Sequence, residues 1–255
     1  DRNPSISWGY NKLVFAHWTG AAWKLETIET KSATNDFTSL SYAPDGTPAI
    51  AYRSTAGKGS TRFAKKSGST WVIQVVDPTY GGGYYSLAFD PAGRPAIAYA
   101  FDADRNGSYD TLKLARWNGT TWTTEVVETG VVGYGVFPSL RFDASGNPVM
   151  AHGNGTIRYV QWDGSNWVVE TVANGSCSSL AFDAAGPIVS YGVSSREVRF
   201  ARRVGPGAWT TELVETVAFN WKTELVLDPQ GFPSFTYRRN PGTGYVIGLA
   251  RWVAE

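Results

Sequence analysis

A short pattern recurs along the chain and constrains the fold more than any other feature. It is a proline, then three residues, then an aromatic or histidine side chain. Consecutive copies lie roughly 40 to 50 residues apart, the spacing of β-propeller repeats. A repeat of this length cannot bury its apolar faces alone, so neighbouring copies must stack to form a core. The six copies are Pro4–Trp8, Pro48–Tyr52, Pro95–Tyr99, Pro148–His152, Pro187–Tyr191 and Pro233–Tyr237.

Composition limits the classes of protein that fit. No linker or shift in composition interrupts the 255 residues, so we expect a single β-propeller domain over residues 1–255. The chain has 23 Lys and Arg against 22 Asp and Glu, a net charge of +1, which argues against a nucleic-acid partner. No apolar run approaches the roughly 18 residues of a membrane span. Cys177 is the only cysteine, so stability must come from packing and not from a disulfide.

The copy between Ser86 and Glu128 shows the organisation of one unit most clearly. Its second segment is apolar at successive positions, which is typical of a strand packed on both faces. Its fourth segment alternates between apolar and polar residues, so one face meets water. Glycine-containing turns separate the segments. The four expected strands are Ser86–Asp90, Pro95–Phe101, Leu112–Trp117 and Trp122–Glu128.

The strand count predicts the architecture. Five copies of the first strand, six of the second, six of the third and five of the fourth make 22 strands. We therefore predict an all-β, six-bladed β-propeller of four-stranded antiparallel blades, with the first and last blades incomplete. Five blades are the alternative, although two strands would then be left over. A β-sandwich fits the length but does not account for the repetition.

The repeat also carries a resemblance to a known family. Ser-Leu-x-Phe-Asp-x-x-Gly-x-Pro-x-Ile-x-Tyr, followed by Arg-Trp-x-Gly-x-x-Trp, resembles the repeats of bacterial secreted β-propellers related to the sialidase (BNR, Asp-box) superfamily. Trp162–Trp167 is nearest to an Asp box, with Gln161 where the box has serine. The resemblance implies a secreted or periplasmic protein. It also implies a sialidase set of three arginines, a Tyr–Glu pair and an Asp acid. No motif places that set here, so the sequence favours a binding protein over an enzyme.

One loop has the spacing of a calcium site. Oxygen-bearing side chains stand at positions one, three, five, seven and nine of a segment with Gly107 at position six, as in an EF-hand loop. Lys113 stands at position twelve, where that loop has a bidentate glutamate. We predict a structural calcium ion here, and a polar surface loop without metal is the alternative. The predicted ligands are Asp102, Asp104, Asn106, Ser108 and Asp110.

A second set of residues predicts a ligand site at one rim of the propeller. Aromatic residues just before the first strand of each unit, and arginines just after the second strand, are expected to reach this rim. Aromatic walls with a few polar groups are typical of binding clefts. The alternative for the aromatic residues is that they pack between blades. The alternative for the arginines is that they are solvated loop residues. The residues are Phe37, Arg53, Tyr84, Tyr85, Phe137, Trp221 and Arg238.

These observations favour an extracellular recognition module with a glycan or surface polysaccharide as its partner. Aromatic rings at the rim would stack on sugar rings, and arginine and aspartate would bind hydroxyl groups. A sialidase-like hydrolase or lyase is one alternative, and a protein-interaction scaffold is another. The sequence carries no signal for the oligomeric state.

Overall fold

The computed structural model describes residues 3–30, 37–56, 59–131, 136–194, 196–219, 222–242 and 244–252. These residues form strands, turns and loops, and no helix is found among them. In this part of the chain no helix is therefore long and apolar enough to cross a membrane. The chain divides into two compact units, Asp1–Gly130 and Val131–Glu255.

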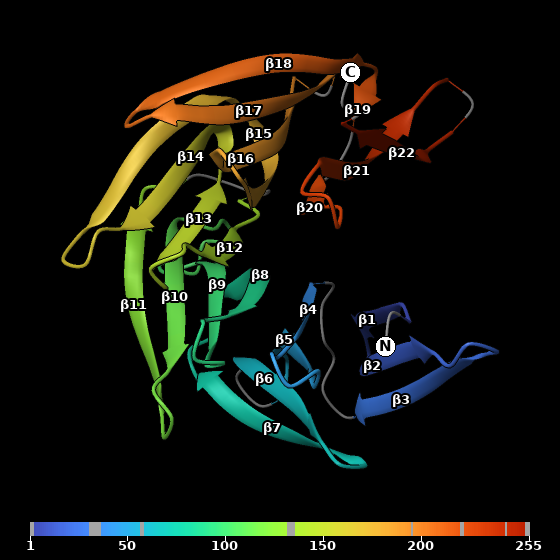
Figure 1. Cartoon of the computed structure of the whole chain (residues 1–255). Coiled ribbons are helices and arrows are strands. Elements are labelled where there is room, and N and C mark those ends of the chain that lie inside the picture. Colours follow the sequence, from blue (N-terminus) through green and yellow to red (C-terminus); the bar gives the residue numbers. More distant parts are fainter. Residues whose placement is uncertain are drawn as a thin grey trace. The chain divides into compact units, whose positions relative to one another are not determined.

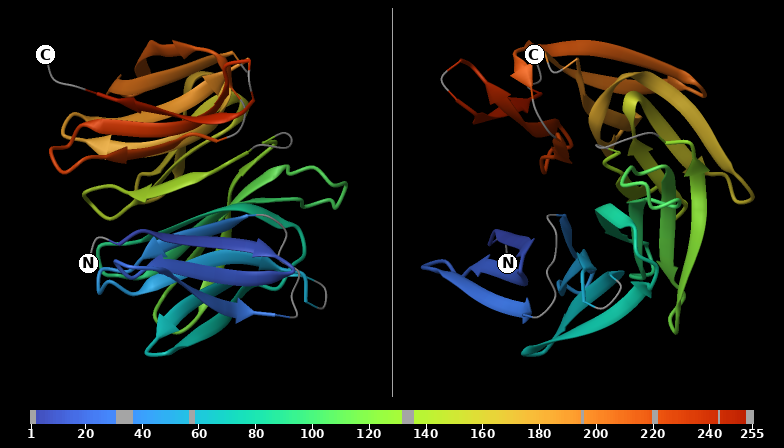
Figure 2. Two further views of the ribbon diagram at one scale, coloured as in Figure 1. Left: turned by 90° about the vertical axis from the view of Figure 1, so that its right-hand side faces the viewer. Right: turned by 180° about the vertical axis from the view of Figure 1, so that it is seen from behind.

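The first unit contains three antiparallel sheets, in each of which the strands lie side by side in chain order (Figures 1 and 2). The first sheet has three strands and the other two have four each. The strands are β1 Ser5–Tyr10, β2 Lys12–Trp18, β3 Trp23–Glu29, β4 Thr38–Tyr42, β5 Pro48–Ser54, β6 Ser60–Ser67, β7 Thr70–Asp77, β8 Gly82–Phe89, β9 Pro95–Phe101, β10 Thr111–Trp117 and β11 Trp122–Thr129.

The second unit contains a seven-stranded sheet and a last, smaller sheet (Figure 1). The long sheet holds two repeats, because β15 continues without a break from the fourth strand of one repeat into the first strand of the next. In the last sheet, β19 and β20 pair with one edge of β21 and β22 pairs with the other. The strands are β12 Ser139–Phe142, β13 Pro148–His152, β14 Asn154–Trp162, β15 Trp167–Asp183, β16 Gly186–Val193, β17 Glu197–Gly205, β18 Ala208–Thr216, β19 Ala218–Phe219, β20 Glu224–Leu227, β21 Pro233–Asn240 and β22 Val246–Arg251.

The strands of the third sheet confirm the unit predicted from the repeat. β9 has the expected bounds, and β10 and β11 each extend one residue further than expected. β8 begins four residues earlier than expected, at Gly82. A Cβ atom on the next residue, Gly83, would lie 2.1 Å from the hydroxyl of Tyr109. The early start of β8 therefore depends on glycine.

The core lies between successive sheets within each unit. All seven residues of β9 are buried, whereas β11 keeps exposed positions along its length. Tyr52, Tyr99 and Tyr191, which end the proline motif, are at most 1% exposed. Burial of a large apolar side chain contributes about 1.5–3 kcal/mol. The motif therefore repeats because these copies fill the space between neighbouring repeats.

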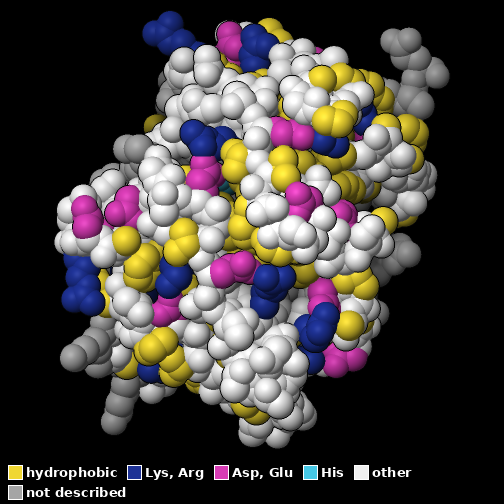
Figure 3. Space-filling model, turned by 90° about the vertical axis from the view of Figure 1, so that its left-hand side faces the viewer, with side chains coloured by type: hydrophobic (Ala, Val, Ile, Leu, Met, Phe, Trp, Pro, Cys, Tyr) yellow, Lys and Arg dark blue, Asp and Glu magenta, His cyan; other side chains and the backbone are white. Residues whose placement is uncertain are grey.

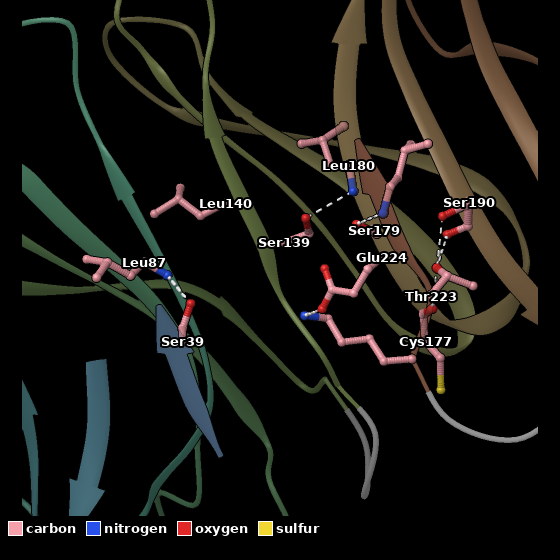
Figure 4. A network of polar contacts seen from close by, with 12 residues as sticks. Ser39, Leu87, Ser139, Leu140, Cys177, Ser179, Leu180, Ser190, Thr223 and Glu224 are labelled. Carbon is pink, nitrogen blue, oxygen red and sulfur yellow. Dashed lines mark hydrogen bonds and ion pairs between the residues drawn. The ribbon is translucent and has the colours of Figure 1, made fainter. Parts of the chain in front are cut away.

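Serine residues in the first strand of three repeats each join one repeat to the next. The hydroxyl of Ser39 in β4 accepts a hydrogen bond from the backbone N–H of Leu87 in β8, at 2.9 Å. In the second unit Ser139 accepts from Leu180 at 3.0 Å and Ser179 accepts from Leu225 at 3.0 Å (Figure 4). The repeated Ser-Leu pair of the sequence is thus a connection from one repeat to the next.

Candidate functional site

Every sheet has two ends, and they differ in chemistry. In an antiparallel sheet, successive connections lie at opposite ends. We call the end with the connections β1–β2, β5–β6, β7–β8 and β9–β10 the loop end. The end with the tight turns β2–β3, β4–β5, β6–β7, β8–β9 and β10–β11 is the turn end. The same connections define the two ends in the second unit.

The aromatic residues predicted to bind a ligand in the first unit lie at the loop end and pack against one another. The rings of Phe37 and Tyr84 lie 4.2 Å apart, and those of Tyr84 and Tyr109 lie 4.9 Å apart. Tyr84 is 8% exposed and Tyr85 is 5% exposed. The hydroxyl of Tyr85 lies 3.4 Å from that of Thr61. In this arrangement the tyrosines contribute to the packing between sheets.

The other predicted ligand-binding residues are divided between the two units. The guanidinium carbon of Arg53 lies over the ring of Tyr80, 5.9 Å from the ring centre. In the second unit Arg238 lies 3.8 Å from the ring centre of Tyr245, and Phe137 is buried. Trp221 lies outside the described residues. A ligand-binding role for these seven residues stays a prediction.

The loop end also contains groups of three buried or partly buried polar side chains that the sequence analysis missed. The tyrosine that ends the proline motif donates to a carboxylate on the fourth strand of the preceding repeat, and a cation binds the same carboxylate. Tyr99 lies 2.7 Å from Asp77, and Lys113 lies 2.5 Å from it. The three groups are Tyr52–Glu29–Arg62, Tyr99–Asp77–Lys113 and Tyr237–Glu215–Arg239.

The electrostatics of these groups favour a structural role. Burial alone would raise the pKa of Asp77, but hydrogen bonds from Lys113 and Tyr99 outweigh it and the pKa lies below its ordinary value. Burial and the adjacent carboxylate raise the pKa of Tyr99, and the same causes raise that of Tyr237 to about 12. Tyr99 therefore stays protonated and donates to the ionised carboxylate of Asp77. In the sequence, each of these three carboxylates stands six residues after the tryptophan of the fourth strand, and this spacing could have predicted the groups.

The predicted calcium loop lies between β9 and β10, and its oxygens are engaged by the loop itself. Both carboxylate oxygens of Asp102 accept backbone N–H groups, from Asn106 and Gly107. Asp104 accepts from Asn106, and Asp110 accepts from Ala103. Among the described residues, no group of three or more His, Cys, Asp or Glu side chains is arranged to hold a metal ion. Calcium binding at this loop stays a prediction.

Two open grooves lie at the turn end of the first unit. Groove A has a volume of about 940 Å³, lies between the first and second sheets, and is lined by Phe15, His17, Trp18, Tyr42 and Lys66 among others. Groove B has a volume of about 640 Å³, lies between the second and third sheets, and is lined by Asp45, Phe63, Lys65, Lys66, Gln74, Arg94 and Trp117 among others. Both volumes fall in the range of small-molecule sites.

The two grooves repeat the same plan with two positions exchanged. Phe15 in groove A and Phe63 in groove B occupy equivalent places in β2 and β6. In groove A, Trp18 from the end of β2 lies on one wall and Lys66 from β6 lies on the other. In groove B, Lys66 from β6 lies on one wall and Trp117 from the end of β10 lies on the other. Each groove therefore presents one indole and the ammonium group of Lys66, and groove B presents that of Lys65 as well.

Each cation of groove B has a carboxylate partner. Lys65 lies 3.4 Å from Asp45, Lys66 lies 2.5 Å from Glu26, and Arg94 lies 2.7 Å from Asp90. On the face drawn in Figure 3, basic side chains likewise lie beside acidic ones, without a patch of one sign. A groove with paired charges offers both donors and acceptors to an uncharged ligand.

The Lys66–Glu26 pair crosses between two sheets, and a similar pair recurs in the second unit. Glu26 in β3 also accepts from the indole N–H of Trp71 in β7. Glu170 accepts from Arg203 and Trp209 in the same way. Tryptophans face each other across the β2–β3 and β10–β11 hairpins, Trp18 opposite Trp23 and Trp117 opposite Trp122. The sequence analysis missed that Trp18 and Trp117 also line grooves.

Comparison with known proteins identifies the fold. No known family profile and no curated protein matches the sequence. The Aleuria aurantia lectin AAL, solved with Fucα1-6GlcNAc, matches with a TM-score of 0.63 at 15% identity, over 98% of this chain and 95% of the lectin. The lectin SapL1, solved with α-methyl fucoside, matches with a TM-score of 0.60 at 14% identity, over 97% of this chain and 92% of the lectin. A Dyadobacter fermentans protein of unknown function matches with a TM-score of 0.60 at 14% identity, over 84% of this chain and 78% of that protein.

These likenesses show the fold and nothing beyond it. A further structure of the Aleuria aurantia lectin, which matches at a TM-score of 0.57 and 14% identity, is described as a six-bladed β-propeller. The chain has this six-bladed β-propeller fold. Its first sheet lacks the first strand of the repeat and its last sheet lacks the fourth among the described residues, as predicted.

Proposed function

We propose that the chain is a carbohydrate-binding recognition module and that grooves A and B at the turn end hold the sugar. The observation that carries this proposal is the repetition of one aromatic and polar groove between successive sheets. Packing alone does not account for a half-buried indole and a paired cation at the mouth of both grooves. Lectins of the same fold that were solved with fucosides support the choice of ligand class.

The chemistry of groove B suits a sugar ring. The apolar face of a pyranose would lie on the indole of Trp117, because aromatic faces attract C–H groups and exclude water. Its hydroxyl groups would donate to the carboxylate of Asp45 and accept from the ammonium of Lys65. Both side chains remain partly accessible, at 60% and 35%. Since every cation is paired, we propose an uncharged sugar, with fucosides as the first ligands to test.

Neither groove has the residues of a glycoside hydrolase. Hydrolysis of this kind needs two carboxyl groups on either side of the scissile bond. Among the described residues, Asp45 is the only carboxylate that lines groove B, and no carboxylate lines groove A. The Tyr52–Glu29 pair of the loop end has the composition of a Tyr–Glu nucleophile pair, but Tyr52 is 0% exposed and burial raises its pKa. Binding is therefore the better-supported activity. A sialidase relationship and secretion stay predictions.

A glycan array screened with the wild-type chain and with Trp117→Ala tests the proposal. We expect binding to a restricted set of neutral glycans, and a loss of about tenfold or more in affinity for Trp117→Ala. Leu25→Ala is the matched control, because Leu25 is 60% exposed on β3 and does not line either groove. If no glycan binds while all three proteins are folded, the proposal is wrong and a protein-interaction scaffold replaces it.

A further inference from the structure

A third open groove of the first unit, which we call groove C, has no role in the proposed function. It has a volume of about 640 Å³ and lies between β3 of the first sheet and the β6–β7 hairpin of the second. Lys66, which lines grooves A and B, lines groove C as well. The lining of groove C includes Lys24, Glu26, Thr27, Lys66, Ser69 and Trp71.

Groove C adjoins groove A on one face of the first sheet. Residues that stand opposite each other on neighbouring antiparallel strands project from the same face. His17 in groove A stands opposite Lys24 in groove C, and Phe15 in groove A stands opposite Glu26 in groove C. The side chain of Lys66 on the second sheet forms part of both linings. A glycan with one sugar in groove A can therefore place the next sugar in groove C.

The charges of groove C are not balanced as those of groove B are. Glu26 lies 2.5 Å from Lys66 and accepts from the indole N–H of Trp71 at 3.0 Å. Burial alone would raise the pKa of Glu26, but hydrogen bonds from Lys66 and Trp71 lower it below its ordinary value. The carboxylate is therefore ionised at neutral pH.

Lys24 supplies the excess charge. Its ammonium group is near enough to Glu26 to lower the pKa of that carboxyl further. No ion pair of Lys24 is found in the part of the chain that the structure describes. Groove C thus contains two ammonium groups and one carboxylate, an excess of one positive charge.

We propose that groove C binds the acidic group of a sugar whose neutral neighbour lies in groove A. The ammonium group of Lys24 binds the anion, which is the carboxylate of a uronic acid or a sulfate ester, because each of these carries one negative charge. The hydroxyl groups of Thr27 and Ser69 are further donors to its oxygens. Hydrogen bonds to an ionised group are stronger than those between neutral groups. This inference rests on the proposed function and extends it from neutral to acidic glycans.

A glycan array that carries neutral glycans beside their uronate and sulfated counterparts tests the proposal. We expect an acidic counterpart to bind the wild-type chain about three- to fivefold more tightly than the neutral glycan does, as an accessible ion pair allows. Lys24→Gln should abolish this gain. Lys12→Gln is the matched control and should retain it, because Lys12 is an exposed lysine of the same sheet that lines none of the three grooves.

A second variant changes the charge of groove C in the opposite direction. Glu26→Gln leaves two ammonium groups without a carboxylate, so we expect the gain for the acidic glycan to increase. Glutamine fits this position. Gln74, which like Glu26 stands three residues after the tryptophan of its fourth strand, accepts from the indole N–H of Trp122 at 3.0 Å.

The outcomes separate this inference from the proposed function. A gain confined to uronate or to sulfated glycans supports the acidic site and identifies its anion. If neutral glycans bind and their acidic counterparts bind no more tightly, groove C is not an acidic site, while the proposed function stands. An equal effect of Lys24→Gln and Lys12→Gln would overturn the acidic site as well. If no glycan of either kind binds, the proposed function is wrong and this inference fails with it.

Discussion

The two ends of the sheets in the first unit are made from similar side chains but arranged for different purposes. At the loop end, a tyrosine, a carboxylate and a cation are buried together, as in Tyr99, Asp77 and Lys113. At the turn end, the carboxylate and cation Asp45 and Lys65 remain accessible beside the half-buried Trp117. The loop end buries these groups, and the turn end leaves them accessible, where we propose that a ligand binds. Burial, more than residue type, distinguishes the two ends.

The largest effect is expected from the removal of a buried carboxylate at the loop end. Asp77→Ala leaves the ammonium of Lys113 and the hydroxyl of Tyr99 without their acceptor. Deleting one partner of a buried ion pair costs about 3–5 kcal/mol. Asp45→Ala at the turn end is the matched control, and we expect it to leave stability unchanged. The free energy of unfolding of both variants is measured in urea. Equal losses of stability would contradict the difference between the two ends.

Acid should weaken the loop end through Asp77. The folded-state pKa of Asp77 lies below its ordinary value, so this group stabilises the fold above its unfolded pKa of about 3.9. That contribution is lost as the pH falls through the folded pKa. We expect the free energy of unfolding to fall more steeply below about pH 4 in the wild type than in Asp77→Asn. If the free energy of unfolding falls equally steeply with pH in both proteins, Asp77 is not the cause of this pH dependence.

Backbone strain at the loop end predicts a smaller effect. Tyr84 and Cys177 occupy equivalent positions in two repeats, and both have positive φ angles, of 52° and 61°. A side chain in this region costs about 1–2 kcal/mol relative to glycine. Cys177→Gly should therefore be more stable than Cys177→Ala by about 1 kcal/mol. Thermal unfolding of the two variants checks the order, and a more stable alanine variant would contradict the strain.

The smallest effect concerns calcium. Each carboxylate oxygen of Asp102 already accepts one backbone N–H group, and a second lone pair is left for an ion. We expect calcium at a concentration near its dissociation constant to raise the free energy of unfolding by less than about 1 kcal/mol relative to a chelator. Asp104→Asn should remove that increment. A large, chelator-sensitive increment would mean that the loop rearranges around the ion.

The sequence predicted the fold well because the fold depends on local periodicity. The proline motif, the alternation of Trp122–Glu128 and the Ser-Leu pair each report a contact that recurs in every repeat. The grooves were not predicted, because they depend on which turn residues of different repeats lie side by side. Trp117 and Trp122 both belong to the repeat motif, yet the sequence gives no sign that Trp117 lines a groove together with Arg94 and Asp45. The burial of Tyr84 was not predicted, because exposure is not visible in a single sequence, and its ligand-binding role stays a prediction.

Titration calorimetry with the best-bound glycan tests the central claim most directly, because it compares the two ends in one experiment. The proteins are the wild type, Trp117→Ala and Trp18→Ala at the turn end, and Arg53→Ala at the loop end. We predict that each tryptophan substitution weakens or removes one class of sites and that Arg53→Ala binds as the wild type does. Loss of binding in Arg53→Ala, with both tryptophan variants unaffected, would place the ligand at the loop end and contradict the account.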